Sequence, residues 1–194
     1  MFGMRPAWVS MSIEYLNQVV DFKRPKLDDD EVRGFVIDYS DSFTLLNVLD
    51  YNFYLNGFTV IRNSDITRYR TYDKDDYFLN MALRLKSIKP ARKPKINLSN
   101  WESILRTAQK LFPLLTIRRE AISKDVCYIG KLVSVTNKTF TLYDIDPDAN
   151  WDRPHQRKLA DLTKVDFGRG YEDALWRVAK EENLIPEKIM YFAI

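Results

Sequence analysis

The hexapeptide FTLLNV at residues 43–48 returns in similar form as FTLYDI at residues 140–145, which is 97 positions later. A second pair of matches, DIT at 65–67 and DLT at 161–163, is 96 positions apart, and one inserted loop residue would account for the difference. A repeat of this length is too long for a solenoid and indicates a duplicated domain. The chain of 194 residues is long enough for two small domains, each with a modest core.

Each half of the chain contains the same succession of short runs rich in β-branched and aromatic residues. Gly34 and Gly130 lie at corresponding places in two of these runs. The chain has 11 Tyr and 11 Phe, residue types that favour the pleated surface of a sheet. We predict strands over residues 32–39, 43–49 and 58–61 in the first half, and 126–135, 139–145 and 157–160 in the second. Strands this short and closely spaced favour small barrels, in which closure removes exposed edges.

Two connections between strands are predicted from their turn residues. Asn56-Gly57 is the pair favoured by a tight type I′ hairpin, so residues 51–55 are expected to fold back on residues 58–62. The corresponding connection in the second half is predicted to be a longer loop, because DPDANWDRPHQ at residues 146–156 is polar and contains two prolines.

Helices are predicted beside the strands of each half. Ser99-Asn100-Trp101-Glu102 matches a capping box, in which the Ser99 hydroxyl accepts a hydrogen bond from a first-turn amide and Glu102 reaches back. Apolar residues then recur at helical spacing as far as Pro113, which predicts a helix over residues 101–112. Two more helices are predicted over residues 75–86 and 172–180, and residues 13–20 fit either a helix or the start of a strand.

These patterns predict a fold that is mainly β with flanking helices, built as two tandem small β-barrels. The first would span residues 1–86 and the second residues 99–194. Residues 87–98 between them contain prolines and several Lys and Arg but few apolar side chains. This composition predicts an extended basic linker rather than packed structure.

The net charge of +3 conceals a strongly basic middle of the chain. Residues 84–124 hold 11 Lys and Arg against 2 Asp and Glu, whereas the segments on either side are acidic. The candidate phosphate-binding cations are Arg84, Lys86, Lys89, Arg92, Lys93, Lys95, Arg118 and Arg119. Such cations can bind a nucleic-acid backbone with release of counterions. Aromatic residues that would stack on bases are missing from residues 84–95, so a solvated linker, or one that docks on acidic faces of its own barrels, is the alternative.

The residue types that most enzymes use are scarce. His155 is the only histidine and Cys127 the only cysteine, so neither an intrachain disulfide nor a thiolate metal cluster is available. The acidic residues between Asp144 and Asp152 alternate as in a calcium loop, but the required glycine and closing glutamate are absent. We therefore predict no catalytic residue, no metal, no cofactor and no enzyme activity. Without an export signal or a long apolar run, the expected location is the cytoplasm, with no membrane partner.

A family resemblance rests on two neighbouring stretches of the first half. GFVIDYSDSFTLLNV at residues 34–48, followed by NGFTVIRNSDITRY at residues 56–69, resembles the two-part signature of Sm-like (LSm) proteins, which are small barrels of the SH3-like kind. The resemblance covers residues 32–70 and extends more faintly to residues 126–166. A helix ahead of the barrel, such as the one predicted over residues 101–112, is also a feature of the family. The chain is similar as well to a group of bacterial proteins with two tandem barrels.

The resemblance implies a uridine site that this sequence retains only in part. Asp41 and Phe43 match the aspartate and the stacking aromatic residue of the first motif, and Arg62 matches the arginine of the second. Leu45 stands where the family has a base-reading asparagine, and Asn63 replaces the glycine that follows the arginine. These departures argue against uridine recognition of the family's kind.

We therefore predict a non-catalytic interaction protein. Its barrels would bind another protein or associate with a second copy of the chain. The alternative is a nucleic-acid-associated protein that binds the phosphate backbone through residues 84–124. An enzyme of another type is the least favoured reading, because histidine and cysteine are each present only once. Fold does not decide among these functions, because small barrels serve many of them.

Overall fold

The computed structural model describes residues 15–72, 76–182 and 184–186. Within these residues the protein is mainly β, with ten strands and three α-helices. The chain divides into two compact units, Met1–Lys93 and Pro94–Ile194, and each is described by itself.

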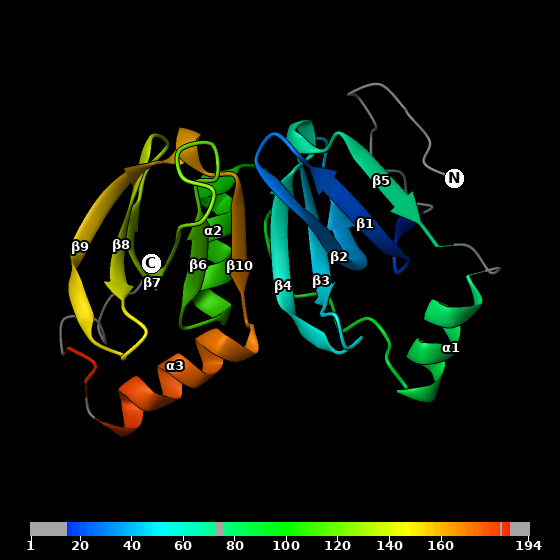
Figure 1. Cartoon of the computed structure of the whole chain (residues 1–194). Helices are drawn as coiled ribbons and strands as arrows, with labels where there is room; N and C mark the ends of the chain where they lie inside the picture. Colours follow the sequence, from blue (N-terminus) through cyan, green and yellow to red (C-terminus); the bar gives the residue numbers. More distant parts are fainter. Residues whose placement is uncertain (1–14, 73–75, 183, 187–194) are drawn as a thin grey trace. The chain divides into compact units, whose positions relative to one another are not determined.

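The first unit is an antiparallel set of five strands followed by a helix (Figure 1). Its elements are β1 (Val19–Arg24), β2 (Asp28–Tyr39), β3 (Phe43–Leu49), β4 (Leu55–Arg62), β5 (Arg68–Thr71) and α1 (Tyr77–Leu85). The strands lie in the order β5-β1-β2-β3-β4. Inward-facing apolar side chains of four strands form its core, namely Val20, Phe22, Val32, Val36, Leu46 and Ile61.

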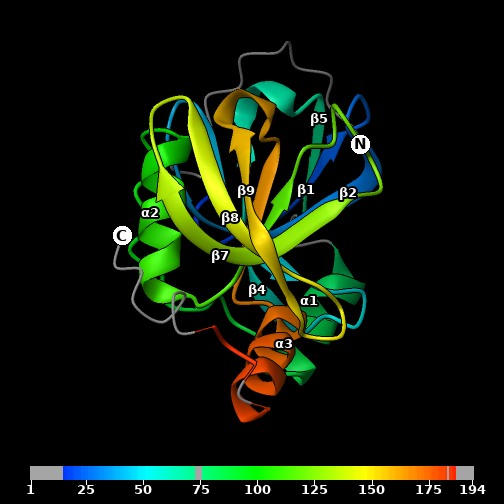
Figure 2. The ribbon, with the colours of Figure 1, turned by 90° about the vertical axis from the view of Figure 1, so that its left-hand side faces the viewer.

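The second unit repeats this arrangement, and its described residues include a helix before its first strand. Its elements are α2 (Trp101–Leu111), β6 (Leu115–Arg118), β7 (Cys127–Val135), β8 (Thr139–Ile145), β9 (Trp151–Lys158), β10 (Lys164–Phe167) and α3 (Gly170–Glu181). The strands lie in the order β10-β6-β7-β8-β9, all antiparallel. Figure 2 shows the long curved strands β7 and β8, with α2 along one side of them. Helix α2 buries Ile104, Leu105 and Ala108.

The strand sets of both units are open in the described residues. No backbone ladder joins β4 to β5, or β9 to β10, within either unit there. The structure therefore shows the mainly β class that the sequence predicts, with one strand order used twice, but it does not show two closed barrels.

The irregularities of the two strand sets coincide as well. The ladder between β2 and β3 shifts register between Val36 and Asp38, and the ladder between β7 and β8 shifts between Leu132 and Ser134, which is 96 positions later. The next ladders shift between Asn47 and Leu49 and between Tyr143 and Ile145, again 96 positions apart. From β2 to β5 the first unit is thus repeated at a constant spacing.

This constant spacing corrects the alignment made from the sequence. In the first unit Phe43 pairs with Arg62. The equivalent pair of the second unit joins Thr139 to Lys158, so Thr139 and not Phe140 corresponds to Phe43. The FTL match at 97 positions is therefore one residue out of structural register, and no inserted loop residue separates it from the match at 96. A shift by one residue exchanges the two faces of a strand, so this distinction matters for the core.

The hairpin predicted at Asn56-Gly57 was wrong. Both residues lie inside β4, and the chain reverses earlier, at residues 50–54. Oδ1 of Asp50 accepts hydrogen bonds from the backbone N–H groups of Asn52 and Tyr54, both at 2.8 Å, which closes the turn. Gly57 has a φ of 68° because it forms a bulge in β4, where the ladder shifts register.

The long loop predicted over residues 146–156 was also wrong. Asp146 closes a short turn as Asp50 does, accepting from the N–H groups of Asp148 at 2.9 Å and Asn150 at 2.8 Å. Strand β9 then begins at Trp151 and continues through Pro154. Its only described ladder is with β8, and proline is tolerated in such an edge strand.

The sequence predicted the positions of the helices correctly but not the residue that caps α2. Helix α2 begins at Trp101, but its N-cap is Asn100, whose side chain accepts a hydrogen bond from the N–H of Ser103 at 2.8 Å. The Ser99 hydroxyl instead donates to Asn97, and Glu102 pairs with Arg106, so the predicted capping box was wrong. Helices α1 and α3 lie where residues 75–86 and 172–180 predicted them. The start of the segment 13–20 lies outside the described residues, and its end enters β1 at Val19.

The segment between the units has no helix or strand over residues 88–97, yet it is not free of packing. The N–H of Ala91 donates to Oδ1 of Asn47 at 2.9 Å, and Lys93 pairs with Asp38 at 3.1 Å. Further on, the N–H of Asn97 donates to the Thr107 hydroxyl, and Ile96 and Leu98 are buried. Residues 88–97 thus have no regular secondary structure, but the prediction that they are unpacked was wrong, because buried polar and apolar groups hold both ends of the segment.

Glu172 in the first turn of α3 is the least satisfied buried acid in the described residues. The residue is 3% exposed, and one carboxylate oxygen accepts a hydrogen bond from the Thr116 hydroxyl. The other oxygen, Oε2, has no partner among the described residues. Burial raises the pKa of Glu172, because its charged form loses hydration that the Thr116 hydroxyl replaces only in part.

Replacing Glu172 by glutamine is therefore expected to stabilise the second unit at pH 7, by about 1 kcal/mol. A carboxyl group whose pKa is higher in the folded than in the unfolded chain contributes most to the free energy of unfolding at low pH. That contribution is lost as the pH rises through the folded pKa. The gain from Glu172→Gln should consequently shrink toward pH 4. Urea denaturation followed by tryptophan fluorescence measures it. The control is Asp173→Asn, in the same turn but exposed, which should lower the free energy of unfolding by a few tenths of a kcal/mol. An equal effect of the two substitutions would contradict this account.

Candidate interaction surface

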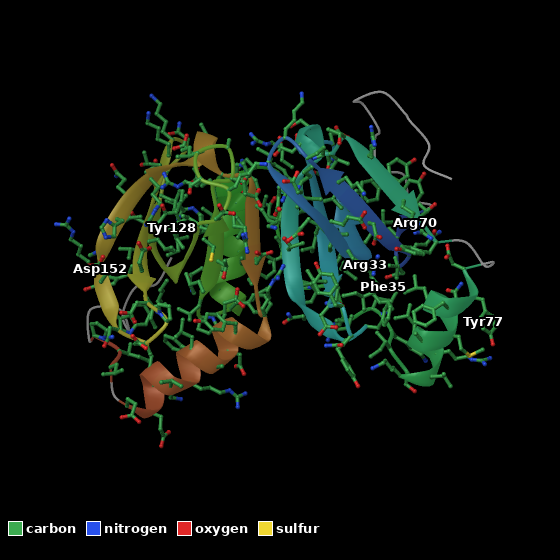
Figure 3. The ribbon with its side chains drawn as sticks, viewed as in Figure 1. Arg33, Phe35, Arg70, Tyr77, Tyr128 and Asp152 are labelled. Carbon is green, nitrogen blue, oxygen red and sulfur yellow. The ribbon has the colours of Figure 1, made fainter. Side chains whose placement is uncertain are left out.

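Helix α1 has an unusual composition for a helix at a protein surface. Its sequence, YFLNMALRL, is apolar on almost every side, although only Leu79 and Leu83 are buried. Tyr77 and Phe78 are each 73% exposed, and Leu85 is 75% exposed. Figure 3 shows Tyr77 on the side of α1 that faces away from the strands. A helix that is hydrophobic all round is normally covered on all sides, so the outer face of α1 is the first candidate for a contact surface.

The turn between β3 and β4 adds aromatic rings to this face. The rings of Phe53 and Phe78 meet edge to face with centroids 5.8 Å apart. The Lys86 ammonium lies 3.9 Å from the centroid of the Tyr54 ring, which is a close cation–π contact. Tyr51, in the same turn, is 87% exposed. We call the set Tyr51, Tyr54, Tyr77, Phe78, Arg84, Leu85 and Lys86 the α1 surface.

Positive charges predominate around the α1 surface. Helix α1 itself contains no acidic residue, and Arg84 near its end contacts the Met81 sulfur at 3.1 Å. Two nearby carboxylates are already engaged: that of Asp50 accepts from the turn, and that of Asp76 pairs with Arg70 at 3.3 Å. Cations continue past the helix, at the exposed Lys86, Lys89 and Arg92. Asp50 keeps its charge, but Arg84, Lys86, Lys89 and Arg92 outnumber it, so the net charge of this part of the described residues is positive.

Helix α3 provides an internal comparison, because it follows β10 as α1 follows β5. Its exposed side chains are mixed: Tyr171 and Val178 lie among Asp173, Arg177 and Lys180. Asp173 and Arg177 form an ion pair at 2.9 Å along the helix. Helix α3 thus has an ordinary solvated face, and the exposed apolar face is that of α1 in the first unit.

The structure places the other predicted cations in different settings. Arg118 lies 3.6 Å from Asp166, and Arg119 lies 3.8 Å from Asp161 and donates to the Tyr128 hydroxyl at 3.0 Å. Both arginines are half-buried beside these carboxylates, and Asp166 also pairs with Arg169 at 2.7 Å. Lys93 pairs with Asp38, whereas Lys89, Arg92 and Lys95 are exposed.

The residues that match the Sm-like site come together at one end of β3 and β4. Phe43 and Arg62 are ladder partners, and the Asn63 side chain donates to the backbone carbonyl of Asp41 at 3.1 Å. Phe43 is only 6% exposed, and Arg62 donates to Asp65 at 3.0 Å. The aromatic ring is therefore packed inside, and the guanidinium is held by a neighbouring carboxylate.

A buried polar cluster in the first unit was missed from the sequence. Arg33 donates two hydrogen bonds to Asp21, each at 2.7 Å, and the Tyr72 hydroxyl donates to the same carboxylate at 2.5 Å. Arg33 also donates to the Tyr72 oxygen at 2.8 Å, and the Arg70 guanidinium lies 4.6 Å from the centre of the Tyr72 ring. Figure 3 labels Arg33 and Arg70 on their strands. An aspartate amid the apolar run VVDF was the available signal.

The ionisation of this cluster indicates a structural role. Burial alone would raise the pKa of Asp21, but the hydrogen bonds from Arg33 and Tyr72 and the charge of Arg33 outweigh it, so the pKa is lowered. Burial and the nearby Asp21 raise the pKa of Tyr72 to about 12. At neutral pH the cluster is thus a carboxylate held by a guanidinium and a neutral phenol, with each group occupied by the others.

No known family model, no curated protein and no solved structure matches this chain. Among the described helices, none combines the length and the apolar character that crossing a bilayer would require.

Proposed function

We propose that this protein is a non-catalytic interaction protein, built from two Sm-like or SH3-like small-barrel modules, that binds a protein partner or a second copy of itself. The observation that carries the proposal is the outer face of α1, where exposed apolar side chains lie on a helix whose inner face is already packed. The strand order used twice and the helix ahead of β6 support the two-module reading. A cytoplasmic location remains a prediction from the sequence.

The described polar clusters favour binding over catalysis. The groups of the Asp21 cluster satisfy one another, and the pKa of Tyr72 lies well above neutrality, which makes it a poor base. His155 and Asp152 form a hydrogen bond at 2.9 Å, but both are on the outer strand β9, and Asp152 is exposed. In the described residues these groups are arranged to hold structure rather than to meet a substrate.

Substituting both Phe78 and Leu85 by serine is expected to abolish partner binding and to leave folding nearly unchanged. The two side chains are largely exposed, so their loss should lower the free energy of unfolding by only about 1 kcal/mol, through the Phe53–Phe78 ring contact and the lower helix propensity of serine. Tagged protein purified from cells that naturally make it, together with sedimentation analysis, measures hetero- and self-association. Tyr171→Ser with Val178→Ser on α3 is the matched control. Retention of the partner by the α1 variant, or its loss from the α3 variant, would refute the assignment.

A nucleic-acid-associated function is the second candidate. It is favoured by the Lys86–Tyr54 contact, which places a cation beside an exposed ring, and by the exposed Lys89, Arg92 and Lys95. Titration with single-stranded RNA at low and at high salt tests it, with Arg92, Lys93 and Lys95 changed to alanine in a variant. This function requires binding that weakens with salt and with the substitutions. Absence of binding at low salt eliminates it.

A further inference from the structure

We infer, on the basis of the proposed function, that the α1 surface binds an acidic peptide segment of another protein that inserts apolar anchor side chains. The central part of protein interfaces is enriched in Tyr, Phe, Met and Arg, the residue types found on α1 and the adjacent turn. Phe78 and Leu85 are seven positions apart, so they lie on one side of α1 about two turns from each other. Side chains so placed can receive two anchors from one segment.

The charge of the partner follows from the charges of the surface. Arg84 and Lys86 lie at the end of α1, and two described carboxylates beside the surface, Asp50 in the adjacent turn and Asp76 before α1, are already engaged. Carboxylates of the partner would therefore meet cations that have no ion-pair partner among the described residues. Electrostatic complementarity of this kind sets specificity and association rate.

The same charges disfavour two other ligands of this surface, a second copy of the chain and a single strand of nucleic acid. In a symmetric dimer the same surface of both copies would meet, so two surfaces that each carry the positive charges of Arg84 and Lys86 would be brought together, and like charges repel. A single nucleic-acid strand needs cations spread along its backbone beside stacked rings. Here Lys86 lies against the Tyr54 ring, but Arg84 and Lys86 gather at one end of α1, whereas Tyr77 and Phe78 lie at the other end.

The test is a selection of peptides from a random display library on the immobilised full-length protein. Selected peptides should combine Asp or Glu with Phe, Trp or Leu. Their affinity should fall by roughly tenfold or more for Phe78→Ser with Leu85→Ser, as for other interface anchors. It should be unchanged for Tyr171→Ser with Val178→Ser on α3. A repeat of the selection on Arg84→Glu with Lys86→Glu should yield basic peptides instead.

Several results would overturn the inference. If the peptides lack acidic residues, or ignore the α1 substitutions, this inference fails while the proposed function stands. If no peptide is selected and the purified protein brings no partner, both fail. If a labelled oligothymidine binds more tightly than the peptides and is released by Phe78→Ser with Leu85→Ser, the ligand is a nucleic acid. Sedimentation showing a dimer that the same substitutions dissociate would make the occupant a second copy.

Discussion

Replacing Gly34 or Gly130 by alanine is expected to destabilise the unit that contains it by about 3 kcal/mol. A Cβ atom added at Gly34 would overlap the backbone carbonyl oxygen of Asn47, and one at Gly130 would overlap that of Tyr143. Because both obstacles are backbone atoms in a neighbouring strand, no side-chain rotation can relieve them. Relief would require the two strands to move apart, at the cost of ladder hydrogen bonds.

Hydrogen exchange in increasing urea, read by mass spectrometry, measures the two units separately. Gly34→Ala should reduce protection of β2 and β3, and Gly130→Ala that of β7 and β8. Gly170→Ala serves as a control, because Gly170 is an exposed residue at the start of α3, where alanine is tolerated at least as well as glycine. If all three substitutions behaved alike, the close approach of strands at Gly34 and Gly130 would not be present in solution.

Replacing Asp21 by asparagine is expected to cost the first unit about 3 kcal/mol at pH 7, the usual result of removing one partner from a buried ion pair. Asp21 is 2% exposed and accepts hydrogen bonds from both Arg33 and Tyr72. Asparagine has nearly the same shape but no charge, and its NH₂ group would face donors. Arg33 would then be left half-buried without its carboxylate.

The pH dependence of this loss follows from the lowered pKa of Asp21. A carboxyl group with a depressed folded pKa contributes its full stability above the unfolded value of about 3.9, and that contribution is lost as the pH falls through the folded pKa. The difference in unfolding free energy between wild type and Asp21→Asn should therefore be constant near neutrality and diminish below about pH 4. A difference that stays the same down to pH 2 would show that Asp21 acts through shape alone. The contribution of the Glu172 side chain to the stability of the second unit should change in the opposite direction, becoming more favourable as the pH falls.

The sequence predicted the class of the fold and several elements within it. The predicted ranges for β3 and β8 agree with the structure, because β-branched and aromatic residues are dense there and turn residues flank them. Strands β5 and β10 were missed, since each has only four residues and no turn signal of its own. Asn56-Gly57 misled the prediction because the same residue pair suits a bulge as well as a turn, and ladder register decides between them.

The candidate surface could be predicted only in part. Arg84 and Lys86 were identified as cations, but the rings that accompany them were not, because Tyr51 and Tyr54 precede α1 by more than twenty positions in the sequence. The fold brings that turn against the helix, as the Phe53–Phe78 and Lys86–Tyr54 contacts show. Arg118 and Arg119 illustrate the reverse case, since side chains that look free in the sequence lie beside the carboxylates of Asp166 and Asp161 once the strands are in place.

Site-specific photo-crosslinking tests the central claim, that the outer face of α1 contacts a macromolecular partner. A photoreactive amino acid would replace Phe78 or Leu85 in the full-length protein, inside cells that naturally make it, with the same replacement at Val178 on α3 as the control. We predict that illumination joins one partner protein to the chain from positions 78 and 85, and none from position 178. Crosslinks from position 178 alone, with none from α1, would contradict the claim.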